Sequence, residues 1–263
     1  MKTKKYSIEN ILSNFKIDAL NEMQLASIEA NKKDADVILL SATGSGKTLA
    51  FLLPILDLLD EENKNTQALI VVPSRELAIQ IEQVFRTMST GYKVTCCYGG
   101  HKRETEENNL VEPPALIIGT PGRLADHIRR GNITLDSIEI LVLDEFDKTL
   151  ELGFLEEVSF IINSLKHLKK RMLTSATEAV EIPEFLGLKN PARLNFLNEG
   201  EDDTGLAIKS VISDEKDKLV TLFKLICYLG NRPTIIFCNH RESVERISNL
   251  LAEKGINNEF YHG

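Results

Sequence analysis

The sequence predicts an α/β fold in which helices flank a mostly parallel β-sheet. Short apolar runs rich in Val, Ile and Leu alternate with helix-length segments, and a polar turn or such a segment follows each run. Because parallel strands end at one edge of a sheet, functional residues are expected in the loops that follow them. The first part of the chain holds six such runs, at residues 37–40, 68–72, 94–98, 116–118, 138–143 and 172–173.

The chain is expected to contain one complete domain and part of a second. Residues 198–205 are acidic, include two glycines and contain no apolar residue, which is typical of an interdomain linker. We therefore assign residues 1–197 to the first domain and residues 206–263 to the second, partial domain. The second domain is predicted to hold strands at 207–212, 234–238 and 259–261, with helices at 216–228 and 242–253.

The composition excludes several classes of protein. The 263 residues are 43% apolar, and their net charge of −8 argues against binding nucleic acid through bulk electrostatics, so a polyanion site must be local. The four cysteines show no C-x-x-C spacing, which argues against a metal cluster or a disulfide framework. No segment has the length and apolar character of a membrane span, and we expect a cytoplasmic protein.

Residues 41–48 form the pattern of a nucleotide phosphate loop between a predicted strand and a predicted helix. Only Ser41 departs from the G-x-x-x-x-G-K-[ST] pattern. Lys47 can reach the β- and γ-phosphate oxygens of ATP, and the Thr48 hydroxyl can bind Mg²⁺. A Gly/Ser-rich turn is the alternative interpretation. The residues predicted to bind the nucleotide in this segment are Thr43, Gly44, Ser45, Gly46, Lys47, Thr48 and Leu49.

Two carboxylates, Asp144 and Glu145, follow the apolar run 138–143 and are predicted to lie beside the phosphate loop. Such a pair is a Walker-B arrangement. Asp144 is expected to hold Mg²⁺, and Glu145 is expected to orient and deprotonate the water that attacks the γ-phosphate. Together with Lys47 they are the predicted catalytic residues. A solvated acidic turn is the alternative.

With these motifs the chain resembles a DEAD-box RNA helicase of superfamily 2, with Phe146 in place of the family's usual alanine. The resemblance implies a RecA-like first domain with a mostly parallel sheet, and a second RecA-like domain that is incomplete. Further motifs occur in the family's order: Pro73-Ser74-Arg75-Glu76-Leu77-Ala78, Gly99-Gly100, Thr120-Pro121-Gly122-Arg123, Ser175-Ala176-Thr177 and Ile235-Ile236-Phe237-Cys238-Asn239.

The resemblance also implies a contact between Gln24 and the adenine base, because Gln24 resembles the glutamine of the family's Q motif. Its amide can pair with N7 and the N6 amino group of adenine, whereas guanine offers acceptors at both positions, so ATP is expected to be preferred over GTP. Ile17 takes the position that stacks on the base. The usual Pro-Thr is replaced by Leu20-Asn21. An ordinary helix-surface residue is the alternative for Gln24.

In the family, residues of three further motifs contact the RNA backbone without reading bases, which implies sequence-tolerant binding of RNA. They correspond here to Ser74, Arg75, Gly99, Gly100, Thr120, Gly122 and Arg123. Taken singly, Arg75 and Arg123 are also typical of exposed residues at helix starts.

The resemblance further implies that Ser175 and Thr177 bond to Asp147 and couple the nucleotide site to strand separation, although a helix N-cap is an alternative role for them. Neither residue has a neighbouring histidine base, which argues against a hydrolase triad.

The arginine-finger and ribose-contacting motifs of the family are not found after Asn239. We therefore expect a helicase truncated within its second RecA-like domain, which binds ATP with Mg²⁺ but hydrolyses it weakly. Apolar helix faces left without partners predict self-association of that domain. An ATP-gated RNA clamp without significant unwinding is the alternative function, and a DNA translocase is a third.

Overall fold

The computed structural model describes residues 6–178, 182–197, 207, 209–213 and 216–262. The chain divides into two compact units, Met1–Thr204 and Gly205–Gly263. The predicted linker, residues 198–205, lies outside the described residues. We refer to the two parts as the first and the second unit and describe each by itself.

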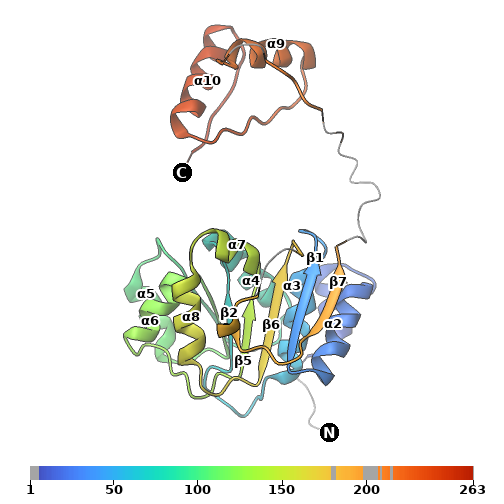
Figure 1. The fold of residues 1–263 in the computed structure, drawn as a ribbon, viewed down its shortest axis with the longest axis vertical. Coiled ribbons are helices and arrows are strands. Elements are labelled where there is room, and N and C mark those ends of the chain that lie inside the picture. Colours follow the sequence, from blue (N-terminus) through green and yellow to red (C-terminus); the bar gives the residue numbers. More distant parts are fainter. Residues whose placement is uncertain (1–5, 179–181, 198–206, 208, 214–215, 263) are drawn as a thin grey trace. The chain divides into compact units, whose positions relative to one another are not determined.

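The first unit is built on a seven-stranded sheet in which every pair of neighbouring strands is parallel (Figure 1). This confirms the predicted fold class. The strand order is β3-β4-β2-β5-β6-β1-β7. The strands are β1 (Asp36–Ser41), β2 (Ala68–Val71), β3 (Val94–Cys97), β4 (Leu116–Gly119), β5 (Ile140–Leu143), β6 (Lys170–Ser175) and β7 (Ala192–Phe196).

Strand β7 was not predicted from the sequence. It pairs with β1 at one edge of the sheet, and its residues alternate between half-buried and exposed. An edge strand in which apolar and polar residues alternate carries no continuous apolar run, because only one of its faces packs on the protein.

Helices cover both faces of the sheet (Figure 1). They are α1 (Ile8–Phe15), α2 (Glu22–Lys33), α3 (Lys47–Leu58), α4 (Arg75–Thr87), α5 (Arg103–Val111), α6 (Pro121–Arg129), α7 (Phe146–Glu151), α8 (Leu155–Ser164) and a short 3₁₀ helix, η1 (Glu184–Leu186). Buried side chains of α1–α4 pack on one face and those of α5–α8 on the other. In β5, Ile140 and Val142 point to the first face, while Leu141 and Leu143 point to the second.

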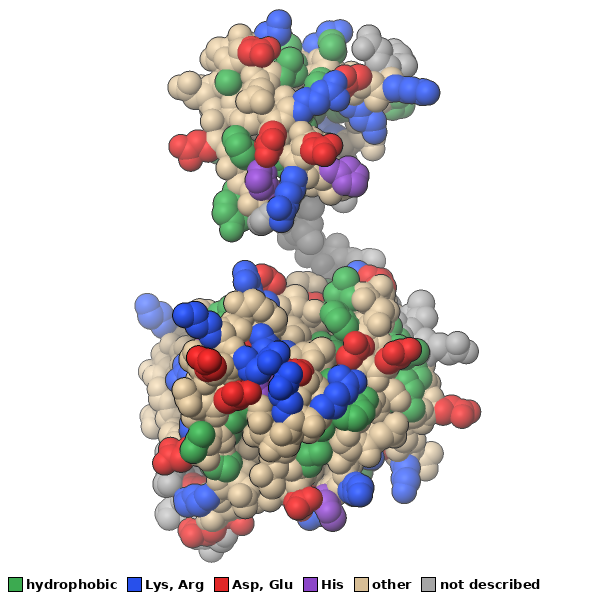
Figure 2. Space-filling view, turned by 90° about the vertical axis from the view of Figure 1, so that its left-hand side faces the viewer, with side chains coloured by type: hydrophobic (Ala, Val, Ile, Leu, Met, Phe, Trp, Pro, Cys, Tyr) green, Lys and Arg blue, Asp and Glu red, His purple; other side chains and the backbone are tan. Residues whose placement is uncertain are grey.

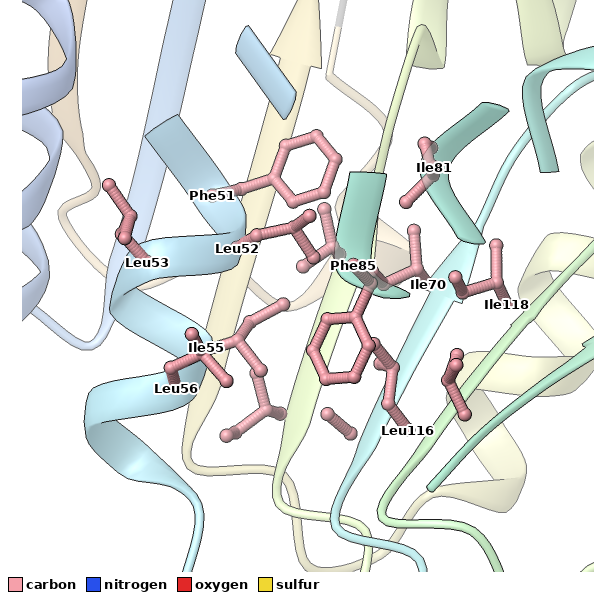
Figure 3. Close-up of a cluster of buried hydrophobic side chains, with 14 of the residues drawn as sticks. Phe51, Leu52, Leu53, Ile55, Leu56, Ile70, Ile81, Phe85, Leu116 and Ile118 are labelled. Atoms are coloured by element: carbon pink, nitrogen blue, oxygen red, sulfur yellow. The ribbon is translucent and has the colours of Figure 1, made fainter. Parts of the chain in front are cut away.

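Figure 3 shows part of the first face, where Phe51, Leu52, Ile55 and Leu56 of α3 meet Ile81 and Phe85 of α4 above the strands. Burial of each such side chain stabilises the fold by about 1.5–3 kcal/mol. This packing fixes α3, which begins at the predicted phosphate loop, rigidly against the sheet.

Pro54 lies inside α3, where it cannot donate a hydrogen bond to the carbonyl of Ala50 one turn earlier. The Ser27 hydroxyl of α2 donates to this carbonyl instead, at 2.6 Å, and Ser27 is buried. The bond therefore satisfies a polar group that the proline would leave unpaired, and it ties α2 to α3.

The second unit contains α9 (Leu219–Leu229) and α10 (Arg241–Glu253), which confirms the two predicted helices apart from shifts at their ends. The strands predicted at 207–212, 234–238 and 259–261 are wrong for the described residues, since none of these joins a ladder. An extended segment becomes a strand only where a neighbour pairs with its backbone. Apolar side chains such as Ile235, Phe237 and Tyr261 are largely exposed. Within the described part of the chain, no helix is both long and apolar enough to cross a membrane.

The contact between Ser27 and Ala50 yields a stability prediction. Replacing Ser27 by Ala is expected to lower the free energy of unfolding by about 1–3 kcal/mol, because the Ala50 carbonyl is then buried without a partner. In a Pro54→Ala background, residue 54 regains an N–H group, and the same change is expected to cost less than about 1 kcal/mol. Urea denaturation of the four variants measures both values; an equal cost of Ser27→Ala in the two backgrounds would contradict this account.

Candidate functional site

The predicted phosphate loop connects the end of β1 at Ser41 to the start of α3 at Lys47. Gly46 precedes the helix with φ +94°, in the left-handed region that favours glycine, and no side chain caps the helix N-terminus. The first N–H groups of α3 are thus available to an anion. Lys47 is only 8% exposed, and its Nζ donates to the Ser41 carbonyl oxygen at 2.8 Å, so the ammonium lies back across the loop.

Helix α2 supports this loop from the side. Asn21 and Gln24 form a capping box at the start of α2, in which each side chain accepts a hydrogen bond from the backbone N–H of the other, at 2.9 and 3.0 Å. The Asn21 amide also donates to the Ser45 carbonyl at 3.0 Å, and the Gln24 amide donates to the Gly46 carbonyl at 3.2 Å. A Cβ atom on Gly46 would lie 2.7 Å from Gln24 Nε2, so glycine is required there.

Gln24 is 4% exposed, so the helix-surface interpretation of this residue is wrong. These bonds use one hydrogen of its amide nitrogen and one lone pair of its oxygen, and each atom has capacity for one more bond. Sequence reasoning missed the role of Asn21, although the Asn-x-x-Gln spacing is a capping-box signal. Ile17 is half-buried and packs against the core beside α1.

Asp144 and Glu145 directly follow β5, and the sheet order β5-β6-β1 places them at the same edge as the phosphate loop. Asp144 is buried, and burial raises the pKa of its carboxyl to about 6, with a smaller contribution from the Glu145 charge. The Thr174 hydroxyl and the Lys47 ammonium act in the opposite direction on this pKa.

Thr174 of β6 organises this acidic pair, and sequence reasoning did not find it. Its hydroxyl donates to Asp144 Oδ1 and accepts from the Glu145 N–H at 3.1 Å. Glu145 has φ +48°, an uncommon conformation for a residue with a side chain, and the second bond helps to hold it. The position of Thr174 next to Ser175, on a strand beside β5, was the available signal.

Asp147 is buried, and its Oδ2 accepts from the Thr177 hydroxyl at 3.2 Å and from the Ala176 N–H at 3.3 Å. The expected bond between Ser175 and Asp147 is wrong: the Ser175 hydroxyl donates to the Thr177 carbonyl at 2.8 Å, because the chain turns back on itself after β6. Asp147 Oδ1 is buried and has no hydrogen-bond partner. Phe146 is buried in the apolar core on the face of the sheet that α5–α8 cover.

The residues expected to contact RNA follow β2, β3 and β4, which are neighbours in the half of the sheet away from the phosphate loop. Ser74 caps α4, since its hydroxyl accepts from the Leu77 N–H at 3.2 Å. Gly99 and Gly122 have open space where a side chain would lie. Thr120 precedes α6, and its N–H donates to the Cys97 carbonyl at 3.0 Å.

The two arginines predicted to contact RNA differ in their surroundings. The Arg75 side chain is 54% exposed and lies over Gly100, with Glu76 Oε1 at 3.3 Å from its Nε. The Arg123 side chain is only 14% exposed and is directed inward to Glu106 and to two backbone carbonyls. Of the two arginines, only Arg75 is therefore an exposed residue at a helix start, which was the alternative interpretation of both. On the side of the first unit shown in Figure 2, Lys and Arg side chains lie among Asp and Glu side chains, which fits the absence of bulk attraction for polyanions.

Oxygen ligands are what Mg²⁺ prefers, and the Asp144 carboxylate and the Thr48 hydroxyl supply them beside the N-terminus of α3. The buried carboxylate of Asp144, whose pKa is raised by burial, fits a cation, because a cation would offset the cost of its burial. The residues present thus suit a phosphate group with a bound divalent cation.

The raised pKa of Asp144 predicts that this residue destabilises the fold without a cation. Between pH 3.8 and about 6 the folded state binds more protons than the unfolded state, so stability falls as the pH rises through this window. Asp144→Asn is expected to stabilise the protein by up to about 3 kcal/mol above this window and hardly at all below it. Thermal unfolding across pH, without divalent cations, measures the difference, with the exposed Asp136→Asn as control. A gain independent of pH would contradict the prediction.

Comparison with known proteins identifies the family. A family model described as DEAD/DEAH box helicase matches residues 21–185. The chain is 33% identical over 248 residues to the ATP-dependent RNA helicase DeaD of Buchnera aphidicola subsp. Schizaphis graminum. This alignment covers 92% of this chain and 41% of that protein. It is 36% identical over 234 residues to the ATP-dependent RNA helicase CshA of Limosilactobacillus reuteri. That alignment covers 87% of this chain and 47% of the relative. The chain thus spans less than half the length of these two relatives.

A solved structure has the same fold. The crystal structure of a DEAD box protein from the hyperthermophile Methanococcus jannaschii aligns with a TM-score of 0.66 and 26% identity, covering 98% of this chain and 71% of that one. The parallel sheet flanked by helices is accordingly RecA-like. The match of the family model over most of the first unit shows that this chain belongs to the DEAD/DEAH box helicase family.

Proposed function

We propose that this chain carries the ATP-binding unit and part of the second domain of an ATP-dependent RNA helicase. One observation carries the proposal: the sheet order separates two groups of motifs along a single edge. The nucleotide motifs follow β5, β6 and β1, and the motifs expected to contact RNA follow β3, β4 and β2. A triphosphate and a strand of RNA would therefore bind side by side on one rigid sheet. A cytoplasmic location is part of the proposal.

In the proposed site, the first N–H groups of α3 and the ammonium of Lys47 bind the phosphates of ATP. To do so Lys47 exchanges its bond to the Ser41 carbonyl for a phosphate oxygen. Thr48 and Asp144 would hold Mg²⁺, which when bound neutralises charge on the phosphate oxygens. As the oxygen of the attacking water bonds to the γ-phosphorus, the bond from this phosphorus to the β–γ bridging oxygen breaks and ADP leaves, while Glu145 accepts a proton from the water. Gln24 and Ile17 would contact the adenine.

The residues around Asp147 are proposed to couple the two halves of the edge. Asp147 follows β5, and Ser175 and Thr177 lie at the end of β6; these two strands lie between β1, which precedes the phosphate loop, and β2, the nearest strand of the RNA half. The unpartnered Asp147 Oδ1 leaves this carboxylate able to take a further hydrogen bond when the domains close. In the proposed cycle, ATP and RNA close two RecA-like domains around a bent strand, and hydrolysis reopens them.

An ATP-gated RNA clamp is the rival function. Glu145 favours the enzyme, because a clamp that does not turn over has no need of a carboxylate that activates water. The Thr174 hydroxyl, which fixes the backbone of Glu145, supports the same conclusion. Self-association of the second unit also stays a prediction, and the exposed Phe237 and Tyr261 side chains support it.

Substitution of Lys47 tests the nucleotide site. Lys47→Ala is expected to weaken binding of ATP with Mg²⁺ by roughly 10- to 100-fold, because a charge-assisted contact to phosphate is lost. Lys32→Ala is the matched control, since Lys32 is exposed on α2 and pairs with Glu29 at 2.7 Å. Isothermal calorimetry measures both affinities. Equal affinities for Lys47→Ala and the unaltered chain would refute the proposed site.

The activity of the 263-residue chain provides a second test. An arginine finger is worth about 10³–10⁵ in kcat, so a chain without one is expected to bind ATP yet hydrolyse it at least about a thousandfold more slowly than a full-length family member. Steady-state phosphate release with saturating RNA, measured for both proteins in parallel, makes the comparison. Comparable RNA-stimulated rates would show that the expected dependence on a second-domain arginine is wrong.

A further inference from the structure

A group of buried polar residues lies beneath the Gly99–Gly100 turn, outside the proposed ATP site. Glu106 of α5 and His127 of α6 are both 0% exposed, which is unusual for ionisable side chains. Arg123 and His127 lie one turn apart on α6 and face Glu106 from the same side. We call Glu106, Arg123 and His127 the Glu106 cluster.

The Glu106 carboxylate is fully engaged. Its Oε1 accepts from the Tyr98 N–H at 3.0 Å and lies 3.3 Å from His101 Nδ1. Its Oε2 lies 2.8 Å from His127 Nε2 and 3.3 Å from Arg123 Nε. Burial alone would raise the pKa of Glu106, but the bonds from His127 and Tyr98 and the Arg123 charge outweigh it and lower the pKa. Glu106 is therefore an ionised, buried carboxylate.

The tautomer of His127 fits this arrangement. Asn132 Nδ2 lies 3.1 Å from His127 Nδ1 and 3.2 Å from Glu107 Oε1. An amide nitrogen only donates, so His127 Nδ1 accepts, and its Nε2 carries the proton that is donated to Glu106. His127 thus serves as a hydrogen-bond donor to Glu106, and Arg123 supplies a positive charge beside the carboxylate.

Arg123 uses the rest of its guanidinium on the same turn. Its Nε lies 3.2 Å from the Tyr98 carbonyl oxygen, and its Nη2 donates to the His101 carbonyl at 2.9 Å. Glu106 holds the N–H of Tyr98 at the same time. The side chains of Arg123 and Glu106 therefore bind the backbone on both sides of the Gly99–Gly100 turn. Gly100 has φ +87°, in the left-handed region that favours glycine. The Tyr98 and His101 rings stack at 5.4 Å and close the turn.

We propose that Glu106 is a positioning residue for RNA binding, which acts by holding Arg123 against the backbone that flanks Gly99–Gly100. The turn then presents its N–H groups to the RNA backbone, and Arg123 acts through the turn without touching a phosphate. This inference rests on the proposed binding of RNA. Under this proposal Arg123 does not make the direct phosphate contact that was expected from the sequence. Arg75, which is exposed over Gly100, is then the arginine that contacts RNA.

A metal site at the same place fits the residues less well. Ligand atoms of Cys97, Glu106 and His127 lie within 4.8 Å of one another. A cation would have to displace the Arg123 charge from Glu106 and remove the proton from His127 Nε2. Burial also raises the pKa of the Cys97 thiol to about 12, so the thiolate that a metal prefers is disfavoured. The cluster is thus complete as an internal ion pair.

The salt dependence of RNA affinity separates positioning from direct contact. Each phosphate neutralised on a single strand contributes about 0.7 to the slope of log affinity against log salt. Backbone N–H groups carry no formal charge, so losing their contacts lowers affinity and leaves this slope nearly unchanged. We therefore compare Arg75→Gln, Arg123→Gln and Glu106→Gln by fluorescence anisotropy, with a labelled single-stranded oligouridylate and an ATP analogue present.

Arg75→Gln is expected to reduce the slope by about 0.7, whereas Arg123→Gln and Glu106→Gln weaken binding about tenfold at an unchanged slope. The double variant is expected to be no weaker than either single one, because the two residues act as a unit. The exposed Glu104→Gln on α5 is the control and should bind as the unaltered chain does. ATP affinity, measured in parallel, reports whether each variant is folded.

A slope reduced by Arg123→Gln as much as by Arg75→Gln would overturn the inference, since Arg123 would then contact phosphate. Unchanged affinity in folded Glu106→Gln would overturn it as well. If Glu106→Gln does not fold, the comparison of the two arginine variants still decides. Failure of the unaltered chain to bind RNA while it binds ATP would reject the proposed RNA site itself, and the inference with it.

Discussion

The parallel direction of all seven strands is the constraint on which the rest of the structure depends. It brings the ends of β1–β6 to one edge, so loops that are far apart in the sequence become neighbours. The strand order then sorts them: the phosphate loop and the acidic motif fall in one half, and the glycine turns with Arg75 fall in the other. In this order β5 and β6 lie between β1, which precedes the phosphate loop, and β2, which precedes Arg75. For this reason we propose a coupling role for Asp147, Ser175 and Thr177, which follow or end these two strands.

Three buried carboxylates near this edge of the sheet, those of Asp144, Asp147 and Glu106, are each stabilised by specific hydrogen-bond or charge partners. Asp144 is held by Thr174, Asp147 by Thr177 and the Ala176 N–H, and Glu106 by Arg123 and His127. The balance between the cost of burial and the stabilisation by hydrogen-bond donors differs between Asp144 and Glu106. The pKa of Asp144 is raised because burial dominates, while the pKa of Glu106 is lowered because its donors dominate. A cation at Asp144, as proposed above, would offset the cost of burying this carboxylate, whereas Glu106 already has its charge partner inside the protein.

Much of this could be predicted from the sequence, since strand runs, glycines and the Lys47 motif are local signals. The missed features are contacts between distant residues: Thr174 with Asp144, Arg123 with Glu106, and Ser27 with the carbonyl that Pro54 leaves unpaired. Apolar and polar residues alternate in the edge strand β7, so it lacked a continuous apolar run. The strands predicted in the second unit were wrong among the described residues, because apolar segments alone do not supply a pairing partner.

We propose above all that a triphosphate binds between the loop at Lys47 and the acidic pair at Asp144. The most direct test is a crystal structure of the chain with a non-hydrolysable ATP analogue and Mn²⁺, which is located by its anomalous signal. Phosphate density is expected over the N-terminus of α3, with the Mn²⁺ peak near the Thr48 hydroxyl and the Asp144 carboxylate. Density for the analogue and the metal elsewhere, with this edge of the sheet vacant, would contradict it.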